Sequence, residues 1–350
     1  MDRHEKALQI LAAGTVIPAT PLALDENRKF DEKRQRLLTR YYLEAGSGGI
    51  ATAVHSTQFE IRDPEINLFD TVLKTVSDEI ARYETETGKT IVKIAGVCGK
   101  TEQAVKETRL AKGFGYDAVL VSPGGLADLS EAELVERTRA VAAEMPVIGF
   151  YLQPSVGGRV FSYSYWEQIC AIPNVVAIKC APFNRYLTLD VVRACALSPR
   201  GEEITLYTGN DDNILVDLMT EYRFTKDGKT VTKRFSGGLL GHWCVWTNNV
   251  AQLFERVKAQ PASPELLTLA AEITDANGVI FDAANGFSGC IPGIHEILRR
   301  QGLLKGIWCL NPEETLSPGQ AEEIDRICDM YPHLTDDAFV KEFLKRHECV

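Results

Sequence analysis

The sequence lacks the features of several classes of protein. No apolar run approaches the roughly 18 residues that a membrane span needs, and residues 1–6 lack the cationic and then apolar order of a signal peptide. The nine cysteines are an odd number without a Cys-x-x-Cys pair, so we interpret them as reduced thiols rather than zinc ligands or a redox pair. We therefore expect a cytoplasmic protein with no membrane partner.

Positive charge is also scarce. Lys plus Arg number 38 against 48 for Asp plus Glu, so the net charge is 38 − 48 = −10. A field of this sign repels phosphate backbones, and nucleic acid is not an expected partner. With 45% hydrophobic and 25% charged residues the chain has an ordinary globular composition, and 350 residues suffice for one large barrel or two smaller domains.

Three partial motifs for nucleotides or metals occur in the wrong context. Residues 46–51 fit G-x-G-x-x-A but enter a predicted strand instead of leaving one. Gly99-Lys100-Thr101 copies the end of a P-loop, yet Ile94 occupies the place of its first glycine, and Arg299 occupies the place of the second histidine of a zinc helix. We expect neither a cofactor nor a metal.

Short apolar, β-branched runs alternate with amphipathic stretches along the chain. Near-continuous apolarity is typical of parallel strands that are covered on both faces. Eight such runs occur, at 15–20, 49–54, 90–97, 118–122, 147–152, 175–180, 205–209 and 238–243. This repeat favours a (β/α)8 TIM barrel over residues 1–260, with an open doubly wound sheet as the alternative.

Two additions to the barrel are predicted. Residues 261–350 contain further helical patterns and are predicted to form a C-terminal helical region, with helices at 264–281, 293–301, 318–330 and 336–346. Within 222–235, Asp227-Gly228 lies between two polar β-type runs, which predicts a β-hairpin inserted before the eighth strand. This cationic hairpin is interpreted as a solvated flap or a subunit contact.

The strongest candidate for chemistry is Lys179, at the carboxyl end of the apolar run 175–180. In such barrels the working groups lie at this end of the strands. A poorly hydrated amine has a lowered pKa and can attack a carbonyl to form a Schiff base. The alternative is a strand-end lysine paired with a carboxylate.

Two further groups are candidates by position. Tyr151 ends the preceding apolar run and could move protons near the amine, although a buried packing tyrosine is the simpler interpretation. Ser56 and Thr57 follow the second run, and their hydroxyl and backbone N–H groups could hold a carboxylate.

Five ordered motifs together resemble the dihydrodipicolinate synthase / N-acetylneuraminate lyase family from about residue 13 to residue 300. They are Ile17-Pro18-Ala19-Thr20-Pro21, Ser56-Thr57, Ala95-Gly96-Val97, Tyr151-x-x-Pro154 and Ala177-Ile178-Lys179. The resemblance implies a barrel enzyme, commonly tetrameric, that acts on pyruvate or another 2-keto acid. It also implies that Lys179 forms the imine, Tyr151 transfers protons, and Ser56 and Thr57 hold the carboxylate.

The chain departs from the family at several positions. Residues 55–59 read His-Ser-Thr-Gln-Phe where the family has a Gly and a Glu, and Pro123-Gly124-Gly125 replaces the paired tyrosines of dihydrodipicolinate synthases. No arginine follows Pro154 at the family's position, although Arg159 and Arg185 are nearby replacements. We therefore do not expect true dihydrodipicolinate synthase activity.

Several functional alternatives remain open at this point. The expected enzyme is a Schiff-base lyase or aldolase, and the alternative reaction is dehydration of a 2-keto-3-deoxy acid on the same lysine. His55 and His242 fall at the predicted catalytic rim and could bind substrate or act as acid or base. A barrel that only binds a keto acid is the non-catalytic alternative, and a homo-oligomer, dimer or tetramer, is expected in either case.

Overall fold

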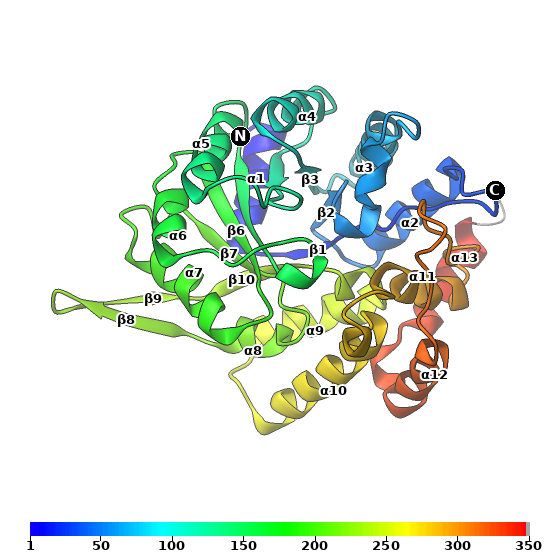
Figure 1. Ribbon diagram of the computed structural model, residues 1–350. Helices are drawn as coiled ribbons and strands as arrows, with labels where there is room; N and C mark the ends of the chain where they lie inside the picture. Colours follow the sequence, from blue (N-terminus) through cyan, green and yellow to red (C-terminus); the bar gives the residue numbers. More distant parts are fainter. Residues whose placement is uncertain (348–350) are drawn as a thin grey trace. The chain divides into compact units, whose positions relative to one another are not determined.

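The computed structural model describes residues 1–347 and confirms the predicted barrel. Eight strands form one sheet in the order β1-β10-β7-β6-β5-β4-β3-β2, and an isolated parallel bridge between Ala19 and Ala51 joins its two ends. The strands are β1 (Val16–Pro18), β2 (Gly49–Thr52), β3 (Val92–Val97), β4 (Ala118–Val121), β5 (Val147–Leu152), β6 (Val175–Ala181), β7 (Thr205–Thr208) and β10 (Phe235–Leu240). Figure 1 shows their alternation with helices.

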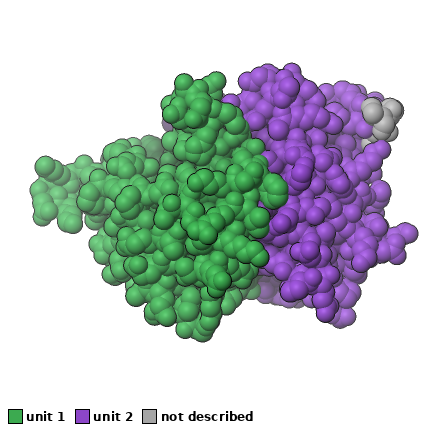
Figure 2. Space-filling view, turned by 90° about the horizontal axis from the view of Figure 1, so that it is seen from above, with its two compact units in different colours: residues 1–15, 92–239 green, residues 16–91, 240–350 purple. Residues whose placement is uncertain are grey.

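The chain divides into two compact units, which Figure 2 draws in different colours. Unit 1 contains residues 1–15 and 92–239, and unit 2 contains residues 16–91 and the segment that begins at Leu240. Residue 260, the predicted end of the barrel domain, lies inside unit 2, and that boundary stays a prediction.

Unit 1 carries strands β3 to β7, whose side chains are almost all buried because helices cover them. Ser130 caps α5 in a capping box, in which Glu133 bonds back to the Ser130 N–H. The helices are α1 (Arg3–Ala13), α4 (Thr101–Gly113), α5 (Glu131–Ala142), α6 (Tyr163–Cys170), α7 (Arg185–Leu197) and α8 (Ile214–Met219).

The predicted hairpin is also confirmed in unit 1. Strands β8 (Tyr222–Lys226) and β9 (Lys229–Lys233) form a separate antiparallel two-stranded sheet. Asp227, at φ 51°, and Gly228, at φ 74°, form the connecting turn, as expected for a turn with two left-handed positions.

Unit 2 contains the two longest helices and the predicted C-terminal helical region. Its helices are α2 (Glu32–Glu44), α3 (Phe69–Thr87), α9 (Thr247–Ala259), α10 (Pro264–Ile280), α11 (Cys290–Arg300), α12 (Gln320–Met330) and α13 (Asp337–His347). Among residues 1–347, no helix is both long and apolar enough to cross a membrane.

Candidate active site

Lys179 lies near the carboxyl end of β6 and is 9% exposed. Its Nζ atom is 4.5 Å from the centroid of the Phe150 ring, a distance at which a cation is attracted to the face of an aromatic ring. Phe150 in β5 is in register with Lys179, and side chains in register on neighbouring strands share a face of the sheet. The Lys179 side chain is therefore largely buried, and its amine lies over an aromatic ring.

A glycine directly after the other neighbouring strand makes room for the lysine stem. Gly209 follows β7, and its N–H donates to the Cys180 carbonyl at 2.8 Å. A Cβ atom on Gly209 would lie 2.6 Å from the Lys179 Cε and 2.8 Å from the Ala181 Cβ, distances that real structures do not tolerate. Glycine at this position thus leaves free the space that the Lys179 stem occupies.

Tyr151 is in register with Cys180 instead of Lys179, so it points to the opposite face of the sheet from the amine. Its ring stacks on Trp166 of α6 at 5.1 Å, and its oxygen accepts a hydrogen bond from the Phe161 N–H. Burial raises the pKa of the Tyr151 phenol. This placement gives Tyr151 a packing role, and the proton transfer expected of it stays a prediction that its described contacts do not support.

The two arginines near these strands are held by other groups of unit 1. The Arg159 guanidinium donates to the Leu129 carbonyl at 2.6 Å and lies over the Phe161 ring. The Arg185 guanidinium donates to the buried Asp217 carboxylate at 2.5 Å. A guanidinium has five N–H donors, so these contacts orient each arginine without using all of its donors.

In unit 2, Ser56 and Thr57 lie in a short 3-10 helix, η1 (His55–Thr57), after β2. The Ser56 hydroxyl donates to the Ala19 carbonyl, and the Thr57 hydroxyl donates to the Thr20 carbonyl at 2.7 Å. A hydroxyl has one hydrogen to donate. As the structure stands, both side chains fix the loop against the end of β1, and their hydrogens are not available to a substrate carboxylate.

The two predicted rim histidines also belong to unit 2. His55 is half-buried, with its ring 5.9 Å from that of Phe59. His242 is buried beside Trp246, and burial lowers its pKa to about 4 although a hydrogen bond with Asn277 acts in the opposite direction. His242 is therefore a neutral imidazole near pH 7, which does not favour a role as general acid there.

Sequence reasoning missed Phe150 and Gly209, which contact Lys179 directly. The run Gly149-Phe150-Tyr151 offers two neighbouring aromatic residues, and only the strand register tells which of them shares the face of the lysine. Gly209 ends the seventh apolar run, a position that can signal a close backbone approach. Among residues 1–347, no group of three or more His, Cys, Asp or Glu side chains has an arrangement that could hold a metal ion.

Comparisons with known proteins agree on the fold. A sequence model of the dihydrodipicolinate synthetase family matches residues 12–222. A search of curated proteins finds no match. Among solved structures, dihydrodipicolinate synthase from Oceanobacillus iheyensis has a TM-score of 0.72 at 16% identity, covering 95% of this chain and 100% of its own.

Two further solved structures are similar over most of their length. The chloride-inhibited dihydrodipicolinate synthase from Acinetobacter baumannii, complexed with pyruvate, has a TM-score of 0.72 at 19% identity, covering 91% of this chain and 98% of its own. N-acetylneuraminate lyase from Fusobacterium nucleatum has a TM-score of 0.70 at 17% identity, covering 91% and 99%. At these identities the likeness concerns the fold alone.

Proposed function

Because the chain belongs to the dihydrodipicolinate synthetase family, we propose that it forms a Schiff base between Lys179 and a 2-keto acid. Members of this family are lyases of the class I aldolase type, and the chain is a lyase of this class. One observation carries the assignment of the lysine: a buried amine at the carboxyl end of β6 lies against the Phe150 ring, and its stem occupies space that Gly209 leaves free.

The proposed reaction begins with attack of the neutral Lys179 amine on the keto carbon. The carbinolamine that forms loses water to give an iminium ion, which accepts electrons when a neighbouring C–C bond breaks. Cleavage releases an aldehyde and leaves an enamine, which takes up a proton before hydrolysis frees the keto acid and the lysine. Aldol addition is the same sequence in reverse, and loss of a substrate hydroxyl as water is the dehydratase alternative.

Pyruvate or a longer keto-sugar acid is the proposed substrate class. The structurally similar Acinetobacter baumannii enzyme was solved in complex with pyruvate, which makes pyruvate the first probe for this chain. We propose that the enzyme is not a true dihydrodipicolinate synthase, because Pro123-Gly124-Gly125 replaces the paired tyrosines and no arginine follows Pro154 at the family's position. A homo-oligomer is proposed as the working assembly.

The test is reductive trapping. The protein is incubated with pyruvate and sodium borohydride, and its intact mass is measured with wild type, Lys179→Ala and Lys93→Ala. Lys93 is a matched control because it is also a buried lysine on a barrel strand, β3. We expect one reduced pyruvate adduct on wild type and Lys93→Ala, none on Lys179→Ala, and a loss of turnover in Lys179→Ala of about 10³-fold or more.

The outcomes separate the alternatives. An adduct that persists in Lys179→Ala would overturn the assignment of the lysine. A trapped adduct with a keto-acid product and no aldehyde, in a screen of 2-keto-3-deoxy acids, would identify a dehydratase. Binding of keto acids without any adduct would identify the non-catalytic barrel.

A further inference from the structure

The β8–β9 hairpin extends away from the other elements of unit 1 (Figure 1). Its strands pair from Tyr222↔Lys233 at the root to Lys226↔Lys229 at the tip. Five residues per strand correspond to a ribbon roughly 17 Å long. Among residues 1–347 these two strands hydrogen-bond as a sheet only with each other, so the outer edge of each strand is free of a further strand.

The root of this hairpin is firmly attached to unit 1. The Lys233 Nζ donates to the Gly201 and Ile204 carbonyls at 2.5 and 2.6 Å. At the other strand, the Tyr222 hydroxyl donates to the buried Asp217 carboxylate at 3.3 Å, and its ring packs edge-on against Phe235. These contacts fix the direction in which the ribbon leaves the unit.

The tip has no comparable support. Lys226 and Lys229 lie directly opposite each other and are exposed, an arrangement of like charges that destabilises a strand pair. Neither lysine forms an ion pair with any residue in the described part of the chain. An isolated two-stranded hairpin is at best marginally stable in water. An anionic surface at the tip would relieve the repulsion and order the ribbon.

The rest of the chain carries net negative charge. Residues 222–233 contain four cationic side chains and one acidic side chain, a net charge of +3. Since the whole chain carries −10, the remaining residues carry −10 − 3 = −13. A cationic arm on an otherwise acidic protein is complementary to a second copy of the same protein.

We propose that the β8–β9 hairpin is an intersubunit arm whose tip, at Lys226 and Lys229, docks on an acidic surface of a second copy of this chain. In a two-fold dimer the contact occurs twice, since each copy supplies one arm and one acidic surface. The inference rests on the proposed homo-oligomer and is independent of the lysine chemistry.

The first test measures assembly by sedimentation velocity over a range of protein concentrations. Wild type is compared with Lys226→Glu/Lys229→Glu and with a control, Lys6→Glu/Lys106→Glu, that reverses two exposed lysines elsewhere on unit 1. We expect charge reversal at the tip to weaken self-association at least tenfold, and the control to leave it unchanged. Added salt should weaken wild-type association, because exposed charges are screened.

The second test locates the contact. A mixture of ¹⁴N- and ¹⁵N-labelled protein is treated with a carbodiimide, which joins a lysine amine to a carboxylate in direct contact, and linked peptides are identified by mass spectrometry. Mixed-isotope links from Lys226 or Lys229 to an Asp or Glu support the proposal. A wild type that sediments as a 38.7 kDa monomer would overturn both the arm and the proposed homo-oligomer. Unchanged self-association after tip reversal would overturn the arm alone, and the borohydride test would be unaffected by either result.

Discussion

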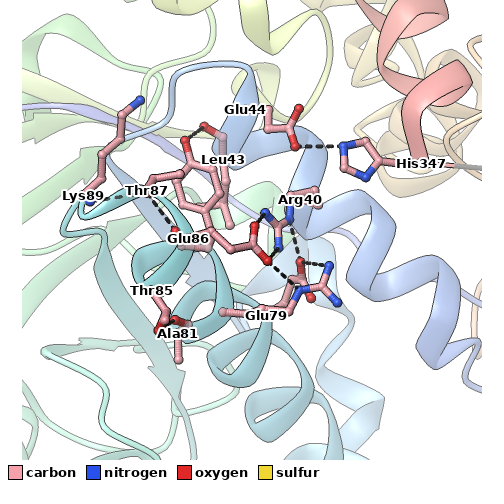
Figure 3. Close-up of polar contacts among 12 residues, drawn as sticks. Arg40, Leu43, Glu44, Glu79, Ala81, Thr85, Glu86, Thr87, Lys89 and His347 are labelled. Atoms are coloured by element: carbon pink, nitrogen blue, oxygen red, sulfur yellow. Dashed lines mark hydrogen bonds and ion pairs between the residues drawn. The ribbon is translucent and has the colours of Figure 1, made fainter. Parts of the chain in front are cut away.

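Two buried cations in this protein differ in the contacts that the structure gives them. Arg40 of α2 is 4% exposed and lies among carboxylates of α3: it donates to Glu79 at 2.7 Å and to Glu86 (Figure 3). Burial alone would lower the pKa of Arg40, but the hydrogen bonds with Glu86 and Glu79 outweigh it and raise the pKa. Lys179 is 9% exposed and lies against the Phe150 ring and Gly209.

The comparison shows that burial by itself does not decide what a cationic group does. A guanidinium stays charged in proteins, and the ion pairs of Arg40 with Glu79 and Glu86 connect α2 to α3. An amine, unlike a guanidinium, can lose its proton and act as a nucleophile. The Arg40 cluster is thus structural in character, whereas the nucleophilic role proposed for Lys179 requires a group that can lose its proton.

Removing a carboxylate from the Arg40 cluster should produce the largest change in stability. Glu79→Leu leaves a buried guanidinium with only Glu86 as its acidic partner, and we expect the free energy of unfolding to fall by about 3 kcal/mol. Glu86 is half-exposed, so Glu86→Gln should cost no more than about 1 kcal/mol. Urea denaturation measures both changes.

Borohydride trapping on the same variants tests whether the Arg40 cluster affects adduct formation at Lys179. Under conditions where both variants are folded, their pyruvate adducts should match that of wild type. A stability loss no greater for Glu79→Leu than for Glu86→Gln would show that the ion pair is not what anchors Arg40.

The buried histidines extend the comparison to a group that stays neutral. His242 and His295 both have a pKa lowered to about 4 by burial, against an ordinary value of 6.5. Between these values the unfolded chain binds more protons than the folded chain, so stability falls as the pH decreases from 6.5 towards 4. Each histidine should contribute at most about 3 kcal/mol to this loss.

His242→Gln should therefore remove about half of the acid sensitivity that the two histidines cause, and His242→Gln/His295→Gln should remove nearly all of it. Urea denaturation at several pH values between 4 and 7 provides the measurement. Equal pH dependence in wild type and the double variant would mean that neither histidine is held neutral by the fold.

The barrel could be predicted from the sequence because its signal is repeated. Each apolar run and each turn, such as Asp227-Gly228, indicates its own element, and errors of a few residues at the ends do not change the architecture. The sequence predicts the eighth strand at 238–243, and the strand lies at Phe235–Leu240. The helix Arg3–Ala13 is absent from the predicted elements, although Asp2 and Glu5 form a capping box that the sequence displays.

The site was less predictable, because a shift of one residue in the register of a strand moves each of its side chains to the other face of the sheet. Lys179 could be identified since a single lysine ends its run, whereas Phe150 and Tyr151 are adjacent and only one of them can share the face of Lys179. The hydroxyls of Ser56 and Thr57 donate to carbonyls of residues more than thirty positions away, which no local pattern indicates.

The contact between Phe150 and Lys179 gives the smallest of these expected effects and the most direct test of the comparison. Phe150→Leu keeps an apolar side chain but removes the ring face, so the iminium ion formed on Lys179 loses a favourable interaction of about 1 kcal/mol. The pyruvate concentration that gives half-maximal borohydride adduct should therefore rise about fivefold. Tyr151→Phe, which keeps the packing on Trp166 but removes a hydroxyl on the opposite face, is the matched control and should leave that concentration unchanged. The reverse pattern, with Tyr151→Phe impaired and Phe150→Leu normal, would assign the catalytic role to Tyr151. It would also show that the Phe150 ring does not stabilise the iminium ion.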